Sequence, residues 1–459
     1  MKSTIIVVLL VIASVTSAFA QKRDSVEKFS YHVQQTLVGQ SAGYNPPTQS
    51  QIGHNTFDDQ SLKVSLSSTF YLGHKLWRGA SVYVNPDIAG GAGLGGTVGI
   101  AGYVNGEIFR VGNPAPTLYI SRAFVRQYFA IGDEVKYVAT DQNQLGEWVP
   151  TNRVQFTIGK FSMADVFDNN HYSHDPRTRF LNWSLMNAGS YDFPSNTKGY
   201  TYGAVIERIT PNFSARVGVG MEPQYSNGPL TTNRNSGMLD MEYGYNGYGV
   251  TAEVEAPIHQ GSGKDATIRI LYFVNSVNAG SYADALNKVV AYRKAGIDTF
   301  VDNASNTLAS SRRSGALKYG FGINVEKPIG QHAGSFMRLN MNDGQTESFA
   351  FAEIDQSASL GFVLHGSAYN RYHDRIEIAG AVNGISQIHR QYLEAGEYGF
   401  MLGEPGMKYG PEYVMEFQYV YDLGKDFMVS PDFQLIVNPG YDMNRGIIRV
   451  VGLRTHIQF

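Results

Sequence analysis

Apolar and polar residues alternate along most of the chain. In the segment 61–72, Leu62, Val64 and Leu66 are separated by the polar residues Lys63 and Ser65. A period of two is typical of β-strands with one apolar face. The same period recurs in 153–161, 214–221, 248–256, 267–274, 317–326, 358–366, 412–421, 427–437 and 451–459. The pattern therefore predicts a chain built mainly from β-strands.

Dipeptides that accept a positive φ angle separate these segments and predict hairpin turns. They are Asn105-Gly106, Asn227-Gly228, Asn246-Gly247, Asp343-Gly344 and Asn383-Gly384. One stretch, Tyr282 to Ala295, has a helical pattern and falls where a long loop is expected. Since no proline-rich linker, charge block or short-period repeat interrupts the chain, we expect one domain from residue 21 to residue 459.

The first twenty residues have the features of a secretory signal peptide. Lys2 is followed by the apolar run Ile5 to Ala13 and by the cleavage pattern Ala18-Phe19-Ala20. No later apolar run approaches the roughly 20 residues that a membrane-spanning helix needs. We expect an exported protein that begins near Gln21, with room for a periplasmic or lumenal extension from there to about residue 40.

Two kinds of architecture share this alternation, a soluble β-sandwich or β-helix and a transmembrane β-barrel. Gly, Ser and Thr gather on the polar side of the strands, whereas large aromatic residues stand near the ends of the apolar side. The aromatic residues assigned to that side are Tyr71, Phe161, Tyr319, Tyr413 and Tyr421. This distribution favours a lipid-facing band with aromatic girdles around a wet lumen. We predict an all-β fold, a closed antiparallel transmembrane barrel of about 16 strands with long loops.

Composition and the absence of known motifs exclude several classes of function. The chain has no Cys, which excludes disulfides and thiol nucleophiles, and its net charge of −3 does not favour a nucleic-acid partner. No G-x-S-x-G, H-E-x-x-H or P-loop motif is present, so we expect no enzymatic activity. His171 and His174 are spaced as metal ligands can be, but a role as polar loop residues is favoured. We expect no cofactor, and leave open a structural calcium ion near the acidic run that starts at Asp165.

Several motifs are similar to those of the carbohydrate-selective porin (OprB) family. They are Gly73-His74-Lys75-Leu76-Trp77-Arg78-Gly79-Ala80, the segment 105–112, the central block from Gly159 to Asn170 that runs on through Ser173 to Trp183, and Val437-Asn438-Pro439-Gly440. The resemblance implies a sixteen-stranded barrel in the outer membrane of a Gram-negative-type bacterium. It implies passive diffusion of sugars, with glucose-type monosaccharides foremost.

The expected partners are the transported sugars, outer-membrane lipid and the barrel-insertion machinery. The chain ends in Phe459. Outer-membrane barrels resemble one another in ending with an aromatic residue, and we expect Phe459 to act as an assembly signal. A monomer is favoured. The alternative from another class is a secreted, soluble β-protein that binds glycans.

Arginines on one strand are the first candidates for the pore. In 118–128, Arg122 and Arg126 share a face with Tyr128, and Tyr119 is assigned to the opposite face. Exposure of arginine to lipid costs roughly 2 to 4 kcal/mol at mid-membrane, so we expect both arginines in the lumen. Glu107 and Arg110 precede this strand and are candidates for an ion pair or a rim contact.

The central block is the second candidate, as a loop folded into the barrel. It carries Asp165, Asp168, Asp175, Arg177 and Arg179, followed by Trp183. For the three aspartates, a role in fixing the loop to the wall is favoured. For Arg177, Arg179 and Trp183 we favour contact with sugar, because guanidinium groups bind hydroxyls well and an indole offers an apolar plane. Trp77 is expected in the aromatic girdle instead.

Overall fold

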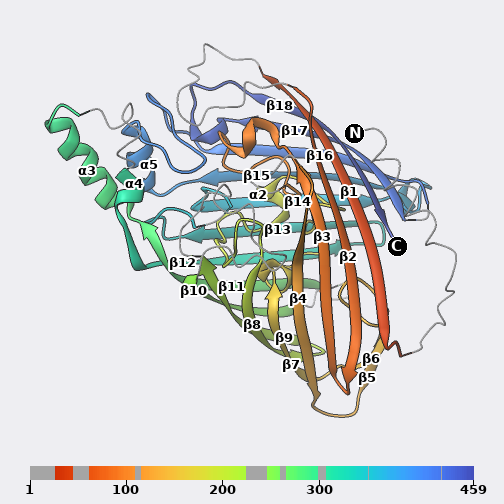
Figure 1. The fold of residues 1–459 in the computed structure, drawn as a ribbon. Helices are drawn as coiled ribbons and strands as arrows, with labels where there is room; N and C mark the ends of the chain where they lie inside the picture. The colour runs from red at the N-terminus through yellow and green to blue at the C-terminus, as the bar shows by residue number, and fades with distance from the viewer. Residues whose placement is uncertain are drawn as a thin grey trace.

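Sixteen antiparallel strands close into a barrel in the computed structural model (Figure 1). The structure describes residues 26–44, 61–108, 115–223, 245–258, 265–297, 307–349, 351–424 and 426–459. The predicted signal peptide and residues 21–25 lie outside these residues. The possible extension to about residue 40 is corrected, because Phe29–Tyr44 is the first strand of the barrel wall. The predicted fold class is confirmed.

The barrel strands follow one another around the wall in chain order. They are β1 (Phe29–Tyr44), β2 (Lys63–Trp77), β3 (Ala80–Gly91), β4 (Thr117–Ala130), β7 (Arg153–Phe161), β8 (Thr201–Thr210), β9 (Phe213–Pro223), β10 (Tyr245–Ile258), β11 (Ala266–Gly280), β12 (Arg312–Ile329), β13 (Ala333–Asn342), β14 (Gln356–His365), β15 (Arg375–Gly384), β16 (Glu412–Asp422), β17 (Phe427–Val437) and β18 (Ile448–Gln458). A separate two-stranded sheet is formed by β5 (Val135–Val138) and β6 (Glu147–Pro150).

The first and last strands close the barrel. β1 pairs with β18 from Gln34 opposite Gln458 to Tyr44 opposite Ile448. Closure leaves no sheet edge in the barrel, and a lipid environment requires this because it offers no hydrogen bonds to unpaired backbone groups.

The two faces of the strands differ as the alternation predicts. In β18, Val451 and Leu453 are 57% and 50% exposed on the outside, whereas Arg454 and His456 are buried inside the barrel. Apolar residues therefore form the outer surface, and most inward positions are polar.

Two aromatic residues assigned to the outer face were placed wrongly. Tyr71 and Phe161 are 4% and 1% exposed, and both line the interior. Each has the parity of an inward residue, since Tyr71 follows Ser67 and Thr69 on β2 and Phe161 follows Thr157 on β7. Their aromatic character outweighed their parity in the prediction. Tyr319, Tyr413 and Tyr421 do lie on the exposed outer face.

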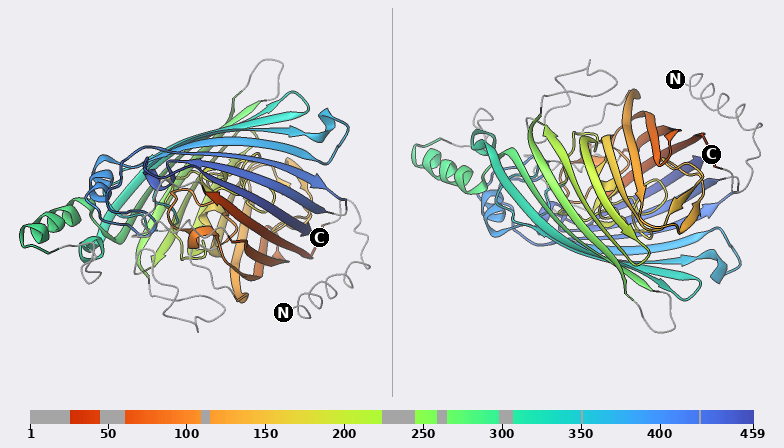
Figure 2. Two further views of the ribbon diagram at one scale, coloured as in Figure 1. Left: turned by 90° about the horizontal axis from the view of Figure 1, so that it is seen from above. Right: turned by 90° about the horizontal axis from the view of Figure 1, so that it is seen from below.

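Connections differ in length at the two ends of the barrel. One end has short turns, such as 78–79, 211–212 and 330–332, and the other end has long loops, such as 162–200 and 385–411. Outer-membrane barrels carry short turns on the periplasmic side and long loops outside the cell. Figures 1 and 2 show α3 (Tyr282–Lys294), α4 (Thr307–Ser310) and α5 (Gln387–Glu394) clustered at the long-loop end, where α3 projects beyond the strands.

The helices of the described residues are α2 (Trp183–Met186), α3 (Tyr282–Lys294), α4 (Thr307–Ser310) and α5 (Gln387–Glu394), with 3₁₀ turns at Leu94–Thr97, Met163–Asp165, Gly366–Ala368 and Pro439–Tyr441. α3 confirms the helix predicted at Tyr282 to Ala295, and α5 was not predicted. None of these helices is long and apolar enough to cross a membrane.

The predicted turns have mixed outcomes. Asp343-Gly344 follows β13 directly, and Gly344 has the positive φ of 56° that the prediction requires. Asn246-Gly247 is instead part of β10, at an irregularity in the pairing with β9. Asn105-Gly106 lies in the long loop after β3, and Asn383-Gly384 forms the end of β15. Asn227-Gly228 lies outside the described residues.

Removal of Phe459 is expected to reduce the amount of folded protein in the outer membrane severalfold. The Phe459 N–H donates to the Val33 carbonyl at 2.9 Å, and its own carbonyl accepts from Val33 N–H at 3.2 Å. Deletion removes both bonds of the closing seam together with the exposed ring. Heat-modifiable mobility of outer-membrane fractions measures the folded amount. Phe459→Ala keeps the backbone bonds, so comparison with the deletion separates the ring from the seam; unchanged assembly of the deletion variant contradicts the prediction.

Candidate functional site

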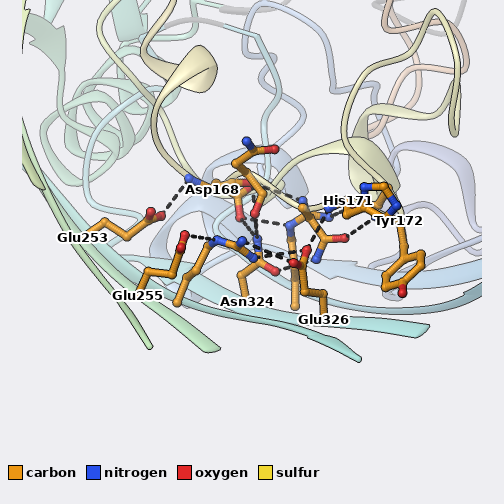
Figure 3. Close-up of polar contacts among 12 residues, drawn as sticks. Asp168, His171, Tyr172, Glu253, Glu255, Asn324 and Glu326 are labelled. Atoms are coloured by element: carbon orange, nitrogen blue, oxygen red, sulfur yellow. Dashed lines mark hydrogen bonds and ion pairs between the residues drawn. The ribbon is translucent and has the colours of Figure 1, made fainter. Parts of the chain in front are cut away.

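The loop 162–200 folds into the barrel, and Asp168 lies at its main attachment point. Asp168 Oδ1 accepts from Arg338 Nε of β13 at 2.9 Å and from Asn324 Nδ2 of β12 at 2.7 Å. Its Oδ2 accepts from the backbone N–H of Ala188 at 2.7 Å, within the same loop. The Arg338 side chain is fully buried. Asp168 therefore joins two parts of the loop to the barrel wall (Figure 3).

Carboxylates on the wall hold the backbone of this loop. Glu253 accepts from Asp168 N–H at 2.7 Å, and Glu326 accepts from His171 N–H at 2.7 Å (Figure 3). On the other side of the barrel, Glu416 accepts from the N–H groups of Leu181 and Asn182 at 2.7 and 2.8 Å. Hydrogen bonds from neutral donors to charged acceptors contribute more than neutral pairs do. The loop is thus fixed from β10, β12 and β16 at once.

Two ion pairs lie where this loop approaches the wall. Arg177 donates from Nε to Glu107 Oε1 at 2.6 Å and from Nη1 to Thr69 at 2.8 Å. Arg122 binds Asp165 through two parallel bonds of 2.7 and 2.5 Å. Burial raises the pKa of Glu107, which Arg177 opposes. Burial also acts to raise the pKa of Asp165, but Arg122 together with the Ser162 N–H holds that pKa below its usual value. Paired charges of this kind offer donors and acceptors without a large net charge.

A cavity of about 520 Å³ lies beside these pairs. It brings together seven of the ten residues that the sequence proposed for the pore and its loop. They are Glu107, Arg122, Arg126, Asp165, Asp175, Arg177 and Trp183.

The other three predicted residues lie elsewhere. Asp168 is at the attachment point, and Arg179 donates to Glu377 of β15 at 2.9 Å, away from the cavity. Arg110 lies outside the described residues.

Aromatic rings form one side of the cavity. Trp183 stacks on Phe351 and on Tyr103, with ring centroids 4.8 and 5.1 Å apart. All three side chains line the cavity, although Trp183 itself is only 5% exposed. The arrangement supplies an apolar surface in the same cavity as the charged pairs.

Tyr119 points into the barrel, which corrects the sequence assignment. The β3–β4 pairing shifts between Asn85 opposite Arg122 and Pro86 opposite Ile120, which leaves Ser121 as an extra residue. Such a bulge reverses the parity of the positions on its two sides. Tyr119 therefore shares the lumen with Arg122 and Arg126, all three lining the cavity.

The remaining candidates from the sequence have ordinary surroundings. Trp77 is 62% exposed at the short-turn end of β2, where its Nε1 donates to Gln127 at 2.8 Å. His174 lines the cavity, and His171 packs edge-on against Tyr172. Within the described residues, no cluster of three or more His, Asp or Glu side chains could hold a metal ion.

Comparison with known proteins places this barrel in a family. The family model described as carbohydrate-selective porin, OprB family, matches residues 54–459. The chain belongs to the OprB family. The family and the fold are those of channels in the Gram-negative outer membrane, so this OprB-family chain is an outer-membrane sugar porin, and the soluble glycan-binding alternative is not favoured.

One solved structure of a porin has the same fold. The high-pH structure of Pseudomonas putida OprB is 16% identical with a TM-score of 0.66, and the match covers 94% of each chain. The low-pH structure of the same protein is 13% identical with a TM-score of 0.46, covering 94% of this chain and 93% of that one. No curated protein matches this OprB-family chain.

Proposed function

We propose that this porin admits neutral, glucose-type monosaccharides by passive diffusion through the 520 Å³ cavity, without a cofactor. The observation that supports the proposal most directly is the composition of the cavity wall. It combines the ion-paired groups Arg122–Asp165 and Arg177–Glu107 with the rings of Trp183 and Phe351.

A sugar needs both kinds of surface. Its hydroxyl groups lose water on entering a narrow passage and need replacement donors and acceptors, which charged side chains supply strongly. Its ring face carries C–H groups that pack against aromatic planes. Conduction also requires that binding stay weak enough for release. Charges already engaged with partners meet that requirement, because they offer their remaining hydrogen-bonding capacity only.

The proposal also covers the oligomeric state of the porin and its insertion into the membrane. We propose that the chain works as a monomer and is inserted by the barrel-insertion machinery, since one closed barrel contains the whole cavity.

Arg122→Ala/Arg126→Ala tests the site. The double variant is expected to fold, to raise conductance by widening the passage, and to shift ion preference toward cations because Asp165 loses its partner. Loss of even one charged hydrogen bond to sugar, worth about 1.5 kcal/mol, weakens glucose block roughly tenfold. Planar-bilayer recordings of reversal potential and sugar block measure both effects.

Arg313→Ala is the control. It removes one arginine whose side chain is 69% exposed at the start of β12, outside the cavity. It should leave glucose block unchanged. A double variant with the parent's reversal potential and the parent's sugar block removes Arg122 and Arg126 from the selectivity site, and Arg177 and Trp183 are then the residues to test.

A further inference from the structure

The connection between β4 and β7 is unlike its neighbours at the short-turn end of the barrel. The turns 78–79, 211–212 and 330–332 there have two or three residues, whereas the chain between Ala130 and Arg153 forms the β5–β6 hairpin. Figure 1 shows this hairpin at the β2–β4 side of the barrel, away from the helices. The other connections at this end have two to nine residues, so a connection of 22 residues, 131–152, needs an explanation.

Polar contacts anchor the hairpin to the inner wall. Thr140 Oγ1 lies 3.0 Å from His32 Nε2, and Gln142 Nε2 donates to Gln34 Oε1 at 2.9 Å, both on β1. Asn85 of β3 donates to Asn143 Oδ1 at 2.8 Å. Lys75 of β2 forms an ion pair with Glu147. The segment therefore folds back into the mouth of the barrel.

The tip of the hairpin separates two cavities. Gln142, Asn143 and Gln144 line the 520 Å³ cavity. A second cavity of about 200 Å³ is lined by hairpin residues that include Lys136, Gln144 and Glu147, together with barrel residues. Arg126 and Gln144 line both cavities, and Arg126 Nη1 donates to the Asn143 carbonyl at 3.0 Å.

We propose that the hairpin 131–152 is a selectivity gate on the periplasmic side, with a monosaccharide-binding subsite formed by the amide groups of Gln34, Gln142, Asn143 and Gln144. The inference rests on the proposed function and adds the exit step. Amides present donors and acceptors without charge, so their bonds to hydroxyls are weaker than those of arginine and carboxylate. A sugar passes from the charged pairs to this weaker site, and then between Arg126 and Gln144 into the second cavity.

Cysteine labelling tests the gate without removing it, because the native chain contains no cysteine. Gln142→Cys places one thiol on the cavity wall. Reaction with a bulky methanethiosulfonate reagent is expected to lower single-channel conductance about twofold or more and to abolish glucose block. Trp148→Cys is the matched control, because Trp148 is on the same hairpin, 48% exposed, and lines neither cavity. Complete labelling at Gln142→Cys with unchanged conductance and block overturns the proposal.

Excision of the hairpin provides a second measurement. Ile131 N–H donates to the Asn152 carbonyl at 2.8 Å, so Gly132–Thr151 can be replaced by an Asn-Gly turn. The folded variant is expected to have higher conductance and to discriminate glucose from a disaccharide about threefold less. If the parent shows glucose block and the excised, folded variant discriminates equally, the gate is wrong and the proposed function stands. If the parent shows no sugar block, the proposed function itself fails.

Discussion

Ile158→Arg is expected to leave little folded protein in the outer membrane, whereas Thr157→Arg at the neighbouring position assembles. Ile158 is 61% exposed on the outer face in the middle of β7, and Thr157 lines the cavity inside. An arginine on the lipid face costs about 2–4 kcal/mol near the bilayer midplane, which no inward position incurs. Heat-modifiable mobility of outer-membrane fractions gives the folded amount for each variant.

The same contrast applies to the last strand. Val451→Arg and Leu453→Arg should also impair insertion, since both side chains are exposed on the outer face. Thr157 is a better control than Gly452, which lies between them. A Cβ added at Gly452 meets Asp432 Oδ1 at 3.3 Å, so a side chain there is crowded inside the barrel. Similar losses for Ile158→Arg and Thr157→Arg would show that the inward and outward faces of β7 are assigned wrongly.

Alternation predicted most of the barrel strands, and the loop that fills the barrel explains one of the strands that it missed. The inward residues Val205 of β8 and Phe273 of β11 are buried beneath loop 162–200 and are apolar. Both faces of those strands then carry apolar residues, so the period of two is blurred at these positions. The strand β8 was not predicted for this reason, and on β11 only the shorter segment 267–274 was found. The strands β1, β3, β13 and β15 were not predicted either.

The position of the arginines in the site could be predicted, but their partners could not. The cost of a guanidinium group in lipid places Arg122 and Arg126 inside, whatever the rest of the fold. The pairing of Arg179 with Glu377 depends on how a loop crosses a barrel, and nearly two hundred residues separate the two. Glu412 and Glu416 were visible as the polar side of an alternating strand, yet nothing local shows that they bind loop backbone. The bulge at Ser121 likewise has no local signal.

Asp168→Ala is expected to release the loop 162–200 from the wall and to raise single-channel conductance severalfold, with loss of sugar block. The substitution leaves the guanidinium group of Arg338 buried without its carboxylate, and breaking a buried pair in this way costs about 3–5 kcal/mol. The backbone contacts of Ala188 and the side-chain contact of Asn324 are lost at the same time. The barrel itself should survive, because the strand pairing does not involve Asp168.

Replacement of Arg338 in addition to Asp168 separates the cost of an unpaired buried charge from the loss of the loop attachment. In Asp168→Ala/Arg338→Met no unpaired charge remains, so the double variant is expected to lose less stability than the single one, as a double-mutant cycle in heat-modifiability measures. His171→Ala is the control within the loop, because the wall binds the backbone of His171 through Glu326 and the substitution keeps that bond. Parent-like conductance in a folded Asp168→Ala variant means that the carboxylates of Glu253, Glu326 and Glu416 hold the loop without Asp168. The wall contacts to the backbone, rather than the single buried ion pair, then fix the loop 162–200 inside the barrel.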